Sequence, residues 1–210
     1  MRRFALALVL AAATPAAAAP PDDLARLIDE HWAWYLQANP EQATTLGERR
    51  YDDRLSDLSL AEADRQAAEA RRFLDRLQAI PDAGLSPADR INKGVLARLL
   101  TEQIEANGFG QRQMLFTTFY GWHQAFAGLA DNMPFRTKAD YESYLTRLAA
   151  YPRLNAEAIA ITRQAVADGY VQPCAAMAGY EKAIIGTVAE DPAKSRFYAP
   201  LTRARPADVS

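Results

Sequence analysis

The sequence is poor in the side chains that form disulfides or bind transition metals. Its 210 residues include one cysteine, Cys174, and two histidines, His31 and His123. A lone cysteine forms no intramolecular disulfide, and no pair of cysteines is present to give zinc-ribbon or redox spacing. Zinc hydrolases that carry their ligands on a helix need two histidines four residues apart, so that both imidazoles lie on one face. The two histidines lie far apart in the sequence, so no such motif is predicted.

The sequence also lacks an excess of positive charge. Lys and Arg number 24 against 26 Asp and Glu, a formal net charge of −2. Without a basic field to hold a phosphate backbone, we expect no nucleic-acid partner. A membrane-spanning helix needs about 20 consecutive apolar residues, and nothing after residue 19 approaches that length, so we expect no membrane span. Hydrophobic residues make up 50% of the chain and charged residues 24%, which is typical of a globular protein.

The first residues resemble an export signal. Arg2 and Arg3 precede an apolar stretch at residues 4–13, and the small residues at 16–19 suit a signal peptidase. This pattern predicts a signal peptide at residues 1–18 and a mature chain at 19–210. The mature protein is therefore expected to be periplasmic or secreted.

Helical patterning dominates the mature chain and predicts an all-α fold, an irregular array of about seven to eight helices without significant sheet. Apolar residues recur every three or four positions from residue 22 to 38, and Ser59, Ser86 and Thr137 occupy capping positions before further periodic segments. The segment 86–107 carries a broad apolar face. Pro152 predicts the start of a new helix that ends at Gly169, and a last helical stretch is expected over 173–188.

The most aromatic segment, residues 111–129, contains the candidate binding residues. Tyr120, Trp122 and His123 could line a groove for a peptide or another ligand, because binding sites often combine aromatic surface with a few polar tips. Packing of the same rings in the core is the alternative. Cys174 is interpreted as a small buried thiol, because no nucleophile motif surrounds it.

Several short patterns, in register along most of the chain, resemble the bacterial family known as domain of unknown function 885. The residues that carry the resemblance are Asp29-Glu30-x-Trp32, Pro40-x-x-Ala43-Thr44-x-x-Gly47, Tyr51-Asp52-Asp53-Arg54-Leu55, Asp89-Arg90-x-Asn92 and Pro134-Phe135-x-Thr137-x-x-Asp140-Tyr141-x-x-Tyr144-Leu145-x-Arg147-Leu148. Each pattern alone is weak, but their common order is fairly specific. The resemblance covers essentially the whole mature chain.

The resemblance implies a place within a longer protein. Members of that family are typically long exported helical proteins similar to gluzincin-type zinc metallopeptidases, with a His-Glu-x-x-Pro-Gly-His motif in the C-terminal half. This sequence has no counterpart of that motif. The resemblance therefore implies that residues 19–210 are the helical N-terminal region of a longer architecture and catalytically inert as given. No catalytic or metal-binding residue is predicted in this chain, zinc is expected only in complete members, and a peptide is the implied substrate of a complete protein.

Two further hypotheses concern partners. A region that normally packs against another half would expose an apolar face, so we expect self-association through such a face. The alternative to an inert peptidase region is a self-sufficient periplasmic binding or interaction module that uses the aromatic segment 111–129 as its surface.

Overall fold

The computed structural model describes residues 19–117, 120–186 and 188–202. The predicted signal peptide, residues 1–18, lies outside them. The described residues fold as an array of helices, which confirms the all-α class, and their one β-type pairing is an isolated antiparallel bridge between Phe116 and Gly121. In the described part of the chain, no helix combines the length and the apolar character that crossing a membrane requires.

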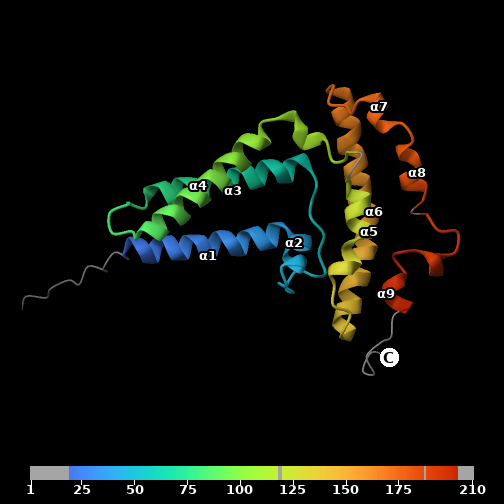
Figure 1. Cartoon of the computed structure of the whole chain (residues 1–210), viewed down its shortest axis with the longest axis horizontal. Coiled ribbons are helices and arrows are strands. Elements are labelled where there is room, and N and C mark those ends of the chain that lie inside the picture. The colour runs from blue at the N-terminus through green and yellow to red at the C-terminus, as the bar shows by residue number, and fades with distance from the viewer. Residues whose placement is uncertain (1–18, 118–119, 187, 203–210) are drawn as a thin grey trace, which may run out of the picture.

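Three long helices, α1 (Pro20–Ala38), α3 (Leu60–Ala79) and α4 (Pro87–Asn107), each contact the other two and form a three-helix bundle (Figure 1). Between α3 and α4 the chain turns at Gly84, whose φ of 90° favours glycine. The apolar sides of the three helices share one core, formed by Leu24, Leu27, Ala70, Phe73, Leu74, Leu77, Ile80, Leu85, Leu96 and Leu100. This bundle is held mainly by hydrophobic burial.

The predicted caps begin the helices where the sequence placed them. The Ser59 hydroxyl accepts a hydrogen bond from the backbone N–H of Glu62 at the start of α3. Ser86 with Asp89, and Thr137 with Asp140, form reciprocal capping boxes at the starts of α4 and α6 (Lys138–Ala167). Each cap satisfies backbone N–H groups that have no partner within the helix, and replacing one by alanine typically costs about 1 kcal/mol.

Helix α6 is a single element of 30 residues, so the prediction that Pro152 starts a new helix is wrong. Pro152 removes the N–H that would bond to the carbonyl four residues earlier, which disfavours a continuous helix by about 3 kcal/mol. Tertiary packing outweighs this cost, because α6 buries side chains on both sides of the proline: Tyr141, Tyr144, Arg147, Leu154, Ala158, Ile161 and Ala165. The helix ends as predicted, with Gly169 at a φ of 84°.

The rest of the chain packs along α6. Helix α5 (Trp122–Ala127) precedes it, and α7 (Cys174–Met177), α8 (Tyr180–Ile185) and α9 (Ala199–Thr202) follow it on the side away from the three-helix bundle (Figure 1). A second core joins α5 and the turn after it to α6, and Leu201 of α9 packs against it; its buried members are Phe126, Leu129, Ala130, Met133, Phe135, Tyr141 and Tyr144. The helical stretch expected over 173–188 is divided into α7 and α8 by Gly179, whose φ is 79°.

A buried arginine connects α6 to α2 (Pro40–Thr45) and the loop after it. Arg147 is fully buried and donates hydrogen bonds to the carbonyls of Pro40, Tyr51 and Arg54 and to the hydroxyl of Thr44. Desolvation lowers the pKa of the guanidinium, and the neighbouring carboxylates of Glu41 and Asp52 oppose that shift. The junction between the two cores is therefore polar and specific rather than apolar.

Candidate functional site

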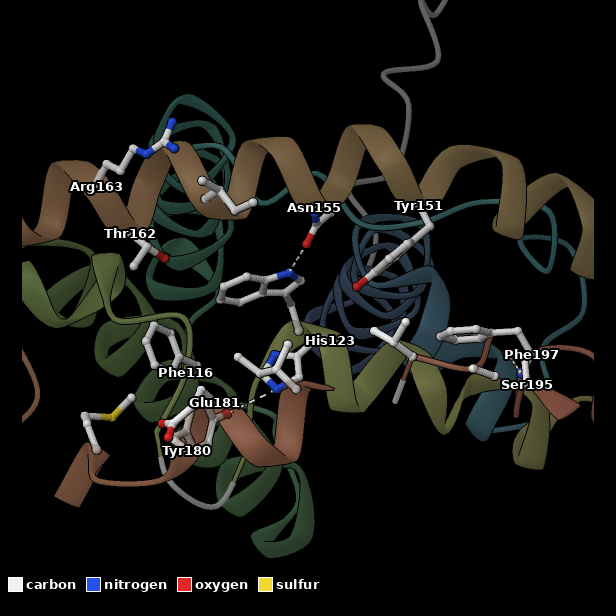
Figure 2. Close-up of a pocket in the computed structure, with 16 residues that line it drawn as sticks. Phe116, His123, Tyr151, Asn155, Thr162, Arg163, Tyr180, Glu181, Ser195 and Phe197 are labelled. Carbon is white, nitrogen blue, oxygen red and sulfur yellow. Dashed lines mark hydrogen bonds between the residues drawn. The ribbon is translucent and has the colours of Figure 1, made fainter. Parts of the chain in front are cut away.

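A cavity of about 880 Å³ opens between α6, α5, α8 and the segment 188–197 (Figure 2). Six aromatic rings line it: Phe116, Trp122, His123, Tyr151, Tyr180 and Phe197. Aliphatic side chains, among them Ile159 and Val188, complete the lining. We call this space the aromatic cavity. Its size falls within the range of about 300–1,000 Å³ that is usual for small-molecule sites.

Trp122 begins α5 and is fixed from two directions. Its indole N–H donates a 2.9 Å hydrogen bond to the side-chain oxygen of Asn155 on α6, and its ring meets Phe116 edge-on with centroids 5.7 Å apart. The residue before it, Gly121, leaves room for this packing. A Cβ at Gly121 would lie 2.7 Å from the His123 ring and 2.9 Å from the Cβ of Phe116, which is too close for any side chain.

His123 and Tyr180 form a polar pair within the largely apolar lining. The Tyr180 hydroxyl lies 3.2 Å from Nε2 of His123, and the Tyr180 ring stacks on Phe116 with centroids 5.7 Å apart. Burial lowers the pKa of His123 and raises the pKa of Tyr180, so both side chains are favoured in their neutral forms. The pair therefore offers one neutral hydrogen bond rather than a charge.

Tyr151 projects from α6 into the same space. Its ring stacks on Phe126, with centroids 4.1 Å apart and planes inclined by 19°. Figure 2 shows its hydroxyl oxygen directed into the cavity, below α6 and beside Asn155. Burial raises the pKa of Tyr151, so the phenol keeps its proton and can donate.

The structure separates the three residues that the sequence grouped. Trp122 and His123 line the aromatic cavity, whereas Tyr120 lies before α5, is 61% exposed and is not part of the lining. Sequence reasoning missed Tyr151, Asn155 and Tyr180. The aromatic character of the two tyrosines was visible, but the predicted break at Pro152 hid that Tyr151 and Asn155 share one face of a single helix.

The two histidines and the cysteine lie in separate parts of the fold. His31 packs edge-on against Phe73, with centroids 5.3 Å apart, and lines a separate groove between α1 and α4. Cys174 is exposed on α7, so its interpretation as a buried thiol is wrong; this four-residue helix buries none of its residues. Within the described ranges, no three His, Cys, Asp or Glu side chains are grouped to hold a metal ion. The described residues therefore offer no ligand set that fits the zinc implied by the resemblance for complete family members.

Comparison with known proteins identifies the family. No curated protein matches the chain. A family model described as "Bacterial protein of unknown function (DUF885)" matches residues 40–209, which include α2 to α9 and every residue of the aromatic cavity named above. The match covers most of the sequence, and we conclude that the chain belongs to this family of bacterial proteins of unknown function, DUF885.

Proposed function

We propose that the chain is an exported, non-catalytic binding region that holds an apolar side chain of a peptide in the aromatic cavity. The observation that carries the proposal is the cavity itself. It is lined by six aromatic rings, and its volume of about 880 Å³ exceeds that of any single amino-acid side chain. Its two hydrogen-bonded pairs, Trp122 with Asn155 and His123 with Tyr180, are neutral, which suits an apolar ligand with one polar attachment. Two charged side chains, Arg163 and Glu181, also contribute to the lining.

The expected affinity is modest. Burying about 200 Å² of an aromatic side chain at about 25 cal/mol per Å² gains about 5 kcal/mol. Association consumes part of this gain through lost translational and rotational freedom. A single bound residue is therefore expected to bind no more tightly than a dissociation constant of about a millimolar. Tighter binding requires contacts along more of the peptide.

The family resemblance supplies the wider context of the proposal. In a complete metallopeptidase-like member, this region would form one side of a substrate cleft, and the zinc chemistry would belong to the part that carries the histidine motif. The predicted signal peptide supports a periplasmic or secreted location. In this role the aromatic cavity binds the peptide and orients it toward a reactive centre, and such positioning accelerates a reaction.

The test is a titration of the chain over residues 19–210 with 3-phenylpropanamide, followed by NMR of the Trp122 indole N–H. Replacing Trp122 by Phe identifies this signal among the three tryptophans. Saturable shifts of the Trp122 signal are expected, and Ile159→Glu is expected to abolish them by placing a charge in the apolar lining. Val166→Glu, also exposed on α6 but outside the cavity, is the matched control. If the Trp122 signal does not shift when 3-phenylpropanamide reaches about 20 mM, 20-fold above a millimolar, the proposal is contradicted.

We also propose that a second copy of the chain covers the exposed side of α4. Ile91, Val95 and Leu99, spaced one helical turn apart, are 66%, 54% and 55% exposed. Val95 and Leu99 border a groove of about 690 Å³ whose other side is formed by Trp32 and Tyr35 of α1.

A second copy is the occupant that this geometry favours. An apolar stripe beside an apolar groove is self-complementary under a two-fold axis, because the stripe of each copy can enter the groove of the other. The polar residues of the groove include Asn92 and Gln103, which carry no charge and so do not oppose this pairing.

A further inference from the structure

Two hydrogen-bond donors on α6 line the aromatic cavity and have no partner within the described part of the chain. They are the hydroxyl of Tyr151 and the side-chain NH₂ of Asn155. Residues four positions apart lie on the same face of a helix, separated by about 6 Å along its axis. A single ligand oxygen placed between the two side chains is therefore within reach of both.

The orientation of the Asn155 amide follows from its partner. The indole N–H of Trp122 can only donate, so the atom of Asn155 that lies 2.9 Å away must be the carbonyl oxygen. This hydrogen bond fixes the amide plane and leaves the NH₂ group to other acceptors. Trp122 thus uses the accepting half of Asn155 and leaves the donating half available.

The position of the Tyr151 hydroxyl is fixed in a similar way. Stacking on Phe126 holds the ring, and Figure 2 shows the oxygen within the space enclosed by Asn155, His123 and Phe197. A phenol surrounded by aromatic rings loses much of its hydration, so a ligand acceptor that restores a hydrogen bond is favoured. The Tyr151 hydroxyl and the Asn155 NH₂ group therefore both favour a ligand that carries a hydrogen-bond acceptor.

The charge of the surroundings decides which acceptor fits. A carboxylate moved into an apolar site without a cation costs far more than a neutral carbonyl, whose cost is offset when it accepts hydrogen bonds. Arg163 contributes to the lining, but in Figure 2 its guanidinium lies on the opposite side of α6 from the Tyr151 hydroxyl. Glu181, in the α8 part of the lining, adds negative charge that disfavours an anion.

We propose that Tyr151 and Asn155 select ligands that carry a neutral carbonyl beside the apolar group, such as the amide of a peptide bond, and discriminate against a carboxylate at that position. This inference rests on the proposed function, because it assigns a polar recognition element to the same cavity. It names Tyr151 and Asn155 as the residues that fix the register of a peptide there.

The test uses three probes with one skeleton: 3-phenylpropanamide, 3-phenylpropanoate and propylbenzene. Dissociation constants are measured at pH 7.5 from the Trp122 indole signal. We expect the amide to bind at least about fivefold more tightly than the carboxylate. Tyr151→Phe keeps the stack on Phe126 and removes only the hydroxyl. It should weaken amide binding by about fivefold and change propylbenzene binding by less than about twofold.

Asn155→Asp is the second variant. It keeps an oxygen for the Trp122 indole and removes the NH₂ donors, so it should also weaken the amide selectively. Equal binding of amide and carboxylate, or equal effects of Tyr151→Phe on amide and propylbenzene, overturns the inference while leaving the cavity as a binding site. Failure of all three probes to bind the unaltered chain overturns the proposed function and this inference together.

Discussion

Arg147 of α6 donates a 2.8 Å hydrogen bond to the hydroxyl of Thr44 in α2, across a separation of 103 residues in the sequence. Thr44 in turn donates to a carboxylate oxygen of Asp52 at 2.6 Å, and all three side chains are buried. The arginine also donates to the carbonyl of Arg54 in the loop after α2, for which it is the side-chain partner. This contact ties the region of the first core to the helix that carries the cavity.

The first prediction concerns this junction. Arg147→Met keeps much of the side-chain volume but leaves the carbonyl of Arg54 without its donor and removes the positive charge from the buried network of Thr44 and Asp52. Removing one partner of a buried charged network typically costs about 3 kcal/mol or more in the free energy of unfolding. Urea unfolding followed by circular dichroism measures the loss.

The matched control is Arg153→Met on the same helix. Arg153 forms an exposed ion pair with Glu157 at 2.6 Å, and such pairs contribute less than about 1 kcal/mol. If both variants lost the same small amount of stability, the Arg147 network would not be what stabilises the junction.

The second prediction concerns Pro152. Its side chain is exposed and it interrupts the hydrogen bonding of α6, so Pro152→Ala should restore one backbone hydrogen bond without loss of packing. The greater entropy of alanine in the unfolded chain offsets part of the gain, which leaves a stabilisation of about 1–2 kcal/mol. Thermal unfolding should show a higher Tm. A lower Tm would instead mean that the proline sets a bend on which the packing of Tyr151 depends.

The sequence predicted those features of the fold that local chemistry determines. Ser59, Ser86 and Thr137 cap helices because a side-chain oxygen satisfies nearby backbone N–H groups, and Gly169 ends α6 because it adopts a positive φ. The prediction for Pro152 was wrong because it, too, used local chemistry alone. Its local preference is to start a helix, and only burial on both sides of it, which the sequence does not display, keeps α6 continuous.

The site was less predictable because it joins distant segments. Trp122 and His123 were found through the density of aromatic residues around them, but their partners Asn155 and Tyr180 lie 33 and 57 residues further on. No periodicity or motif links these positions. The broad apolar face of α4 was predicted, but the pattern did not show which of its side chains are buried. Leu96 and Leu100 enter the core, while Val95 and Leu99 remain exposed.

The third prediction concerns pH. Burial lowers the pKa of both His31 and His123 below the ordinary value of 6.5, so the unfolded chain binds more protons than the folded chain between the lowered values and 6.5. The free energy of unfolding should therefore fall as the pH decreases through 6.5, and level off below the lowered pKa values. Urea unfolding at pH 7.5, 6.5 and 5.5 tests this. The double variant His31→Gln/His123→Gln should show a clearly shallower dependence, and an unchanged slope would assign the effect to other groups.

The fourth prediction concerns the exposed stripe of α4. If a second copy covers Val95 and Leu99, the chain over residues 19–210 should show concentration-dependent dimerisation in sedimentation equilibrium. Val95→Glu places a charge where each copy would enter the groove of the other, so it should weaken the dimer at least tenfold, the equivalent of about 1.4 kcal/mol. Val171→Glu is the matched control, because Val171 is similarly exposed, at 56%, and lies outside the groove. A chain that stays monomeric at millimolar concentration would refute the self-complementary pairing, and equal weakening by both variants would place the contact elsewhere.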